Sequence, residues 1–278
     1  MTGISNIFIY AEPRCRSIEY EDVAAYIQEK MPAVEVFLRG PLLEEFTGGG
    51  EAMTEARARA LAAARVRRLE GPAAQARQPL SGEVEYELRR LRNRESSVFG
   101  ILYDAGMMLE ICRDLIPSTE SGLGDLSIIF TNQLIGNRDL ADKRYHARTV
   151  ILGAPSIVST GGMVEAPART RGYYLARRSG EWLGLQEEEK NRMARSFADD
   201  FLELEDPRLT SVAKGLAMQA VVYRLTGEPF CTDKDCRLFN AHWQSELIRS
   251  QLGSGPEFCR VHSDLLADCQ DLGDRLWT

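Results

Sequence analysis

Four side chains that can bind a metal lie near one another in the last fifth of the sequence, and they restrict the fold more than any other feature. Cys231 and Cys236 are separated by four residues, and Cys259 and His262 by two. Two short pairs joined by a longer segment allow three thiolates and one imidazole to surround one ion tetrahedrally, as in zinc sites. Because four protein ligands leave no position for water, the spacing predicts one structural Zn²⁺ ion that holds residues 228–265 together.

Other interpretations of the cysteines and histidines stay open at this level. The three cysteines could simply be buried core residues, but two chelating pairs within one short segment favour a metal. His242 lies in the same segment and can replace His262 as the fourth ligand, although its neighbours in Phe239–Trp243 are typical of a packed helix start. The other cysteines are isolated and are expected to be ordinary core or surface residues: Cys15, Cys112 and Cys269.

The composition is that of a folded globular protein, with 44% hydrophobic and 27% charged residues and a formal charge of −7. This acidity argues against nucleic acid as the main partner. Arginines are frequent between Arg57 and Arg94, but glutamates are interleaved with them, so we expect solvated helix faces there. No apolar stretch approaches the roughly 20 residues that span a membrane, and no signal peptide is evident. We therefore expect a cytoplasmic protein.

Strand and helix patterns alternate along the chain and predict a single domain of the α+β (mixed α/β) class over residues 1–278. An Ala- and Arg-rich helical insertion is expected at residues 48–94, and a helix that Thr210 can cap is expected to end at Gly227. Strands are expected at residues 6–10, 34–38, 126–131 and 148–152. Further helices are expected at residues 20–30, 51–69, 105–115 and 181–203, and a loop or short hairpin at residues 153–168.

The cysteine pairs make the chain similar to the archaemetzincins, which are zinc-dependent peptidases. In that family a helical H-E-x-x-H-x-x-G-x-x-H motif runs directly into a C-x4-C pair, and a later C-x2-C pair completes a second, structural zinc site. Cys231-x4-Cys236 and Cys259-x2-His262 resemble these two pairs. Weaker similarity, in residues 125–131 and 148–153, extends to the family's strands beside the cleft. A looser similarity in residues 154–160 and 236–244 links the chain to archaeal proteins classed as metallopeptidases, and implies the fold without the activity.

The resemblance places the catalytic motif on residues 220–230, at the end of the helix that stops at Gly227. The family's glycine is present there as Gly227, which lets the chain turn out of the helix. The positions of the three histidines are Ala220, Arg224 and Phe230, that of the glutamate is Val221, and that of the Met-turn methionine is Leu238. None of these side chains binds zinc, and valine cannot act as a general base. The resemblance therefore implies a zincin-like fold without the peptidase residues.

Three functions are compatible with this pattern. The first is a catalytically inactive pseudo-peptidase that binds a peptide, a protein or a small molecule. The second is a hydrolase with a rebuilt site, for which His146 and Glu165 are the candidate acid and base, with arginines nearby. The third is nucleic-acid binding through the arginines and the zinc module, and the acidic balance of the chain ranks it last.

Overall fold

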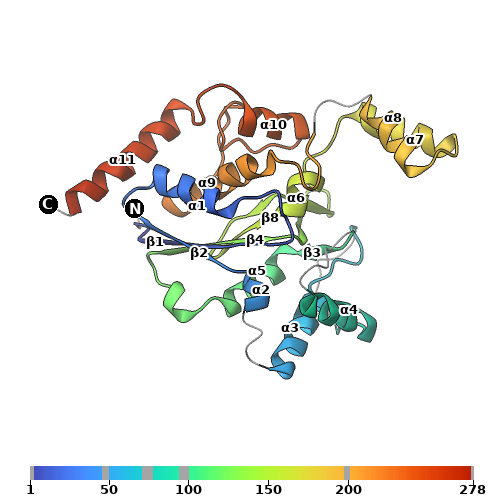
Figure 1. Cartoon of the computed structure of the whole chain (residues 1–278), viewed down its shortest axis with the longest axis horizontal. Coiled ribbons are helices and arrows are strands. Elements are labelled where there is room, and N and C mark those ends of the chain that lie inside the picture. The colour runs from blue at the N-terminus through green and yellow to red at the C-terminus, as the bar shows by residue number, and fades with distance from the viewer. Residues whose placement is uncertain (1–2, 46–49, 71–77, 94–99, 197–200, 277–278) are drawn as a thin grey trace.

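A five-stranded sheet forms the centre of the protein (Figure 1). The structure is a computed structural model that describes residues 3–45, 50–70, 78–93, 100–196 and 201–276. The strand order is β2-β1-β4-β8-β7, and only the edge strand β7 is antiparallel to its neighbour. The strands comprise Asn6–Tyr10 (β1), Glu35–Arg39 (β2), Asp125–Thr131 (β4), Val150–Ile151 (β7) and Ser156–Ser159 (β8).

Apolar side chains cover both faces of this sheet, as is usual for parallel strands. In β1, Ile7 and Ile9 belong to the larger hydrophobic cluster on one face. Phe8 and Tyr10 alternate with them and belong to a second cluster on the other face. All four side chains are buried. The central strands are therefore held by packing from both sides, which explains why β1 and β4 read as continuous apolar runs in the sequence.

Two helices cover the face of the sheet that carries Ile7 and Ile9. They are α1 (Tyr20–Lys30) and α9 (Leu209–Thr226), which pack against each other above the sheet (Figure 1). Almost all of the middle of α9 is buried, and the helix ends at Gly227, whose positive φ of 80° suits a helix C-cap. Three further helices lie on this side: α6 (Thr160–Glu165), α10 (Gln244–Leu252) and α11 (Arg260–Leu276).

The opposite face is covered by α5 (Ala105–Leu115), which packs with a pair of helices, α3 (Glu51–Ala63) and α4 (Ser81–Arg92). The short helix α2 (Leu42–Glu45) leads toward this pair, and a 3-10 turn, Ser118–Glu120, precedes β4. A second, three-stranded sheet contacts α5. It consists of Leu102–Asp104 (β3), Leu134–Arg138 (β5) and Tyr145–Arg148 (β6). Finally, α7 (Arg171–Trp182) and α8 (Glu187–Arg195) form a hairpin that projects from the rest of the fold (Figure 1).

The arginines of the helical pair are more strongly paired than the sequence suggests. Glu87 is completely buried and accepts hydrogen bonds from Arg65 Nε at 2.8 Å, Arg90 Nε at 2.9 Å and the Tyr103 hydroxyl at 2.7 Å. Arg57 is buried as well. These residues are therefore part of the packing between α3, α4 and β3, and the prediction that the arginines form solvated helix faces is wrong for Arg57, Arg65 and Arg90.

The mixed class of helices and sheets is confirmed, and several boundaries are corrected. The helix predicted to reach residue 69 ends at Ala63, because the chain then runs along β3, with Val66 N donating to Leu102 O at 2.8 Å. The strand predicted at residues 148–152 is divided between β6 and β7, which belong to different sheets. The segment expected to be a loop or hairpin at residues 153–168 contains β8, which does pair with β7 as a hairpin, and also the unpredicted helix α6.

Two predicted features of the C-terminal helices are also corrected. The helix expected at residues 181–203 is replaced by α7 and α8, which are separated at Gly184, where φ is 66°; residues 197–200 of that prediction lie outside the described residues. Thr210 does not cap α9; its hydroxyl donates to Ser17 O at 2.9 Å and accepts from Glu19 N at 3.1 Å, which ties α9 to α1.

Within the described part of the chain, no helix combines the length and the apolar character that a membrane crossing needs.

Candidate metal centre and adjoining pocket

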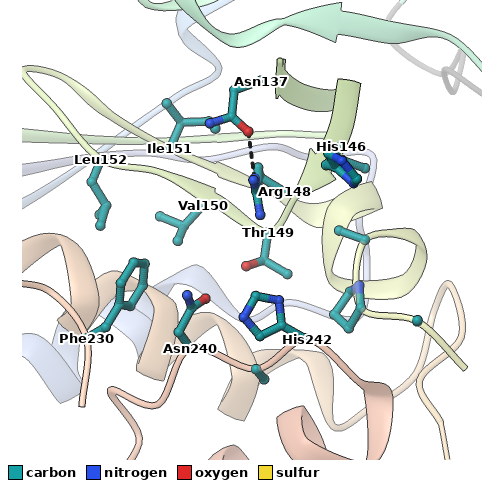
Figure 2. Close-up of a pocket in the computed structure, with 15 residues that line it drawn as sticks. Asn137, His146, Arg148, Thr149, Val150, Ile151, Leu152, Phe230, Asn240 and His242 are labelled. Carbon is teal, nitrogen blue, oxygen red and sulfur yellow. Dashed lines mark hydrogen bonds between the residues drawn. The ribbon is translucent and has the colours of Figure 1, made fainter. Parts of the chain in front are cut away.

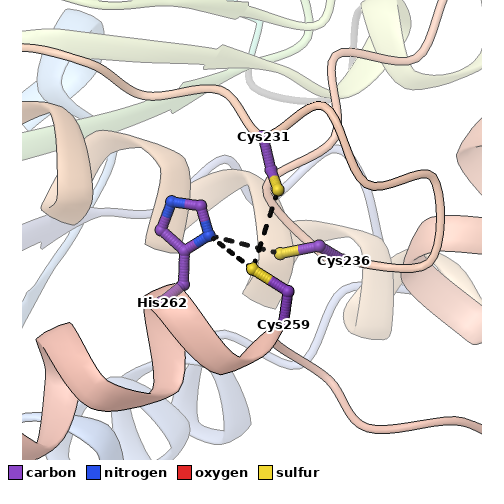
Figure 3. Close-up of side chains that lie close together, drawn as sticks. All are labelled: Cys231, Cys236, Cys259 and His262. Carbon is purple, nitrogen blue, oxygen red and sulfur yellow. Dashed lines mark hydrogen bonds between the residues drawn. The ribbon is translucent and has the colours of Figure 1, made fainter.

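The four predicted metal ligands come from two places in the chain that the fold brings together. Cys231 and Cys236 belong to the turn that follows α9, and Cys259 and His262 lie at the start of α11 (Figure 3). Cys231 N donates to Leu238 O at 2.9 Å, which closes the turn, and Leu238 is completely buried in the main core. The turn is therefore fixed to the core before any ion is considered.

The distances between the ligand atoms match those of a tetrahedral zinc site. Cys231 Sγ and Cys259 Sγ are 3.7 Å apart, and His262 Nδ1 lies 3.7 Å from Cys236 Sγ and 3.1 Å from Cys259 Sγ. All four ligand atoms lie within 4.8 Å of one another, and the cysteines form no disulfide. Zinc–ligand bonds of roughly 2.0–2.3 Å would give ligand–ligand edges of about 3.3–3.8 Å, and only the contact between His262 Nδ1 and Cys259 Sγ, among the three distances given, is slightly shorter. The residues therefore fit one zinc ion with a closed coordination sphere.

Burial favours the uncharged forms of the thiols and of the imidazole when no ion is bound. Burial raises the pKa of the Cys236 thiol, and the neighbouring cysteines raise it further. Burial likewise raises the pKa of Cys231 and lowers that of His262, so the imidazole stays neutral and keeps a lone pair for a metal. Backbone N–H groups point at the sulfur atoms, with Asp233 N 3.3 Å from Cys231 Sγ. Three thiols in this position ionise readily only when a metal supplies the compensating charge.

A charged cluster connects the turn to α1. Glu257, two residues before Cys259, accepts from Lys30 Nζ at 2.9 Å and from Arg237 at 3.1 Å. Arg237 follows Cys236 directly, and its guanidinium lies 5.2 Å from the centre of the Tyr26 ring. Both halves of the candidate zinc site are therefore held against the same helix of the main core.

The positions that the archaemetzincin motif would fill with metal ligands are arranged differently. Ala220 and Val221 are completely buried inside the core formed by α9 and the sheet. Arg224 donates a hydrogen bond to Leu123 O, on the loop before β4. Phe230 is 42% exposed and lies beside a pocket. These residues supply no ligand atom for a metal, so a catalytic metal at this position does not fit the residues present.

The pocket beside Phe230 has a volume of about 590 Å³ and runs along the edge strand β7. Residues 146–152 form one wall, and residues 166–168 and 240–242 form the opposite side. Figure 2 shows Val150, Leu152 and Phe230 toward one end, which we call the apolar end, and His146, Arg148 and His242 toward the other, which we call the basic end. Two of the three histidines in the sequence therefore line one pocket, and the third is a candidate zinc ligand.

The candidate catalytic residues are not brought together. His146 lines the large pocket, whereas Glu165, the last residue of α6, lines a separate cavity of about 300 Å³ with Arg14 and Asn132. The structure places His262, and not His242, with the three cysteines. Of the isolated cysteines, Cys15 and Cys112 are buried and Cys269 is half-buried.

Sequence reasoning missed the partner of His146. Asp142 Oδ2 lies 2.7 Å from His146 Nε2, and Asp139 lies nearby, so the three residues form a second group of potential metal ligands. Both carboxylates also close local turns, since Asp139 accepts from Ala141 N at 2.8 Å and Asp142 from Arg144 N at 2.9 Å. The spacing of four residues between Asp142 and His146 was the available signal. These turns account for the positions of both carboxylates, so no ion is needed to explain why they lie near His146.

Comparison with known proteins gives one informative match. Searches of curated proteins and of solved structures return no significant match. Residues 3–269 match the family model described as "Probable metallopeptidase family (DUF6775)", which covers nearly the whole chain. The chain therefore belongs to this metallopeptidase-like family.

Proposed function

We propose that this protein is a catalytically inactive, archaemetzincin-like member of its family that uses one structural zinc ion and binds an extended peptide in the pocket beside β7. The observation that carries the proposal is the identity of the residues at the metal-ligand positions of the motif: Ala220, Arg224 and Phe230.

The packing of α9 supports the loss of catalysis. A zinc peptidase needs ligands that hold the ion and a base that takes a proton from the attacking water. At the corresponding positions, Ala220 and Val221 face the hydrophobic core and are 0% exposed. Restoring a metal there would require room that these side chains and their neighbours occupy. The family relationship thus supports inheritance of the fold, while the residues themselves argue against zinc-dependent hydrolysis.

The open edge of β7 supports peptide binding. β7 is the edge strand of its sheet, and among the described residues β8 is the strand that pairs with it. Ser159 N donates to Thr149 O at 2.9 Å, so Thr149 directs its backbone groups toward β8. In an antiparallel ladder the next residue points the other way, and the N–H and C=O groups of Val150 therefore face the open edge. An extended peptide can pair with such an edge while its side chains enter the adjoining pocket.

The zinc ion would have a structural role. The four ligands join the turn after α9 to the start of α11 and complete one coordination sphere, which leaves no site for a substrate or a water molecule. Zinc in this position closes the C-terminal part onto the core and contributes to folding rather than to chemistry.

Metal analysis and peptidase assays on the same preparation test the proposal. We expect about one zinc ion per chain by inductively coupled plasma mass spectrometry, no cleavage of a casein or peptide-library substrate, and binding of unstructured peptides by fluorescence anisotropy. A second zinc ion together with metal-dependent cleavage would overturn the loss of catalysis. Failure of every peptide in a library to bind would overturn the assignment of the pocket.

A hydrolase with a rebuilt site is the second candidate, and the contact between His146 and Asp142 favours it. A histidine paired with a carboxylate beside a pocket can exchange protons with a bound substrate. Peptidase and esterase activity of the wild type would be compared with that of His146→Ala and Glu165→Ala. Activity that is equal in all three proteins would remove these residues from consideration. Nucleic-acid binding has less support, because Arg65 and Arg90 are engaged by Glu87.

A further inference from the structure

The large pocket has two chemically different ends, and this difference specifies its ligand more narrowly than peptide binding does. The apolar end presents Val150, Leu152 and Phe230, and the basic end presents His146, Arg148 and His242 (Figure 2). We infer that the pocket selects an extended segment in which an apolar side chain precedes an acidic one. The inference rests on the proposed function and names the class of peptide that the pocket accepts.

The charge of Arg148 at the basic end is not balanced by a neighbouring carboxylate. Among the described residues that line the pocket, none is an aspartate or a glutamate, although the chain as a whole has more acidic than basic residues. Arg148 Nε donates to the neutral amide oxygen of Asn137 at 2.6 Å, and within the described part of the chain Arg148 forms no ion pair. Its guanidinium keeps further donors that suit a carboxylate. Arg148 is therefore the group expected to recognise an acidic side chain.

The two histidines contribute unequally to the basic end. Asp142 does not line the pocket, and its Oδ2 lies 2.7 Å from His146 Nε2, so a carboxylate already engages this imidazole. His242 is exposed and its backbone is fixed by a hydrogen bond from Ala168 N to His242 O at 2.9 Å. A neutral imidazole still donates one hydrogen bond to a carboxylate. His242 thus assists Arg148 without being required to carry a charge.

The apolar end supplies the second contact. Phe230 is 42% exposed even though it is a large aromatic residue, and it faces the pocket with Val150 and Leu152. Covering such a ring with an aliphatic side chain removes apolar surface of both groups from water. An apolar anchor next to one charged contact is the usual combination in small binding pockets.

The direction of β7 sets the order of the two side chains. Along the chain, residues 148–152 run from the basic end to the apolar end. Antiparallel pairing is more stable per residue than parallel pairing, so a peptide added to the open edge runs from the apolar end to the basic end. Side chains two residues apart point to the same face of an extended peptide. The preferred sequence therefore places an apolar residue two positions before an acidic one.

Four labelled peptides test this order and charge. Each is acetylated, amidated and tagged with fluorescein through the same linker: Ala-Leu-Ala-Glu-Ala, the Gln and Lys versions at the fourth position, and the reversed Ala-Glu-Ala-Leu-Ala. By anisotropy we expect the first peptide to bind roughly fivefold more tightly than the Gln version, the size of a partly exposed charge pair. The Lys and reversed versions should bind still more weakly.

Variants of Arg148 locate the effect. Arg148→Gln should remove the preference for Glu over Gln, and Arg148→Lys should retain most of it. Arg59→Gln, in an exposed ion pair on α3, is the matched control and should leave the preference unchanged. Equal binding of the Glu and Gln peptides to the wild type, or tighter binding of the reversed peptide, would overturn the inference and leave the proposed function intact. Absence of binding by all four peptides and by a peptide library would overturn both.

Discussion

Loss of the zinc ion is the perturbation whose cost follows most directly from the structure. Cys236 and Cys259 enclose residues 237–258, and an ion held by the four candidate ligands would cross-link them. A covalent cross-link that closes a loop of about 24 residues stabilises a fold by roughly 3.5 kcal/mol, and we take this as the scale for an ion that only the folded chain binds. A change of 1 kcal/mol shifts Tm by about 2–4 °C in a chain of this size. We therefore expect removal of zinc to lower Tm by about 7–14 °C.

The assay is differential scanning fluorimetry in reducing buffer, before and after treatment with a zinc chelator, with metal content measured on both samples. Hydrogen exchange should then increase in residues 228–265 and stay low in β1 and β4, because these strands are held by packing on both faces. Cys259→Ser should reproduce the loss of metal. Cys269→Ser, which changes a half-buried cysteine outside the cluster, should keep one zinc ion per chain. A metal-free protein with an unchanged Tm would refute the structural role.

Three substitutions test single contacts. Glu87→Gln removes the charge that two arginines share, and urea denaturation should show a loss of about 3–5 kcal/mol; a loss under about 1 kcal/mol would contradict the buried network. The hydrogen bond from Arg208 holds the pKa of Asp206 below its ordinary value, so its stabilisation is present above about pH 4 and is lost as the pH falls through the lowered pKa. The stability difference between wild type and Asp206→Asn should therefore shrink on acidification, and a constant difference would disprove this. Phe230→Ala should weaken binding of the apolar–acidic peptide roughly tenfold in anisotropy while Tm stays within about 2 °C; unchanged affinity would exclude Phe230 from the pocket's function.

Elements whose signal is local could be predicted from the sequence. The bounds of β1, α1 and α5 agree with the expected ranges, because apolar spacing and end signals coincide within each segment. β8 has only four residues between a Gly-Pro region and a glycine pair, so its pattern was too short to separate from a loop. The division of residues 145–151 between two sheets depends on the second partner of each neighbouring strand, because β5 also pairs with β3 and β8 also pairs with β4, both distant in the sequence. Pairing of that kind leaves no local pattern.

The candidate site shows the same contrast. The grouping of three cysteines and one histidine could be predicted because each pair is short and each member has side-chain chemistry suited to a metal. The pocket could not, because its walls come from β7, the end of α6 and the turn after α9, which meet only in the fold. Asp142 was missed because its role depends on the hairpin that brings it to His146, and the sequence offers only a spacing that is common in acidic loops.

The turn that carries Cys231 and Cys236 also forms one wall of the pocket, and this links the candidate metal centre to the proposed peptide binding. Phe230 directly precedes Cys231, and residues 240–242 follow shortly after Cys236. His242 O and Gln244 N bond to Ala168 at 2.9 and 2.8 Å, so this wall is tied to the segment that follows α6. An ion that fixes Cys231 and Cys236 against α11 therefore also fixes Phe230 and His242. If the protein has the proposed function, removal of zinc by a chelator should weaken binding of the apolar–acidic peptide even at temperatures where the core stays folded. If the metal-free protein bound the peptide with full affinity, the zinc ion would have no role in peptide binding and would contribute to stability alone.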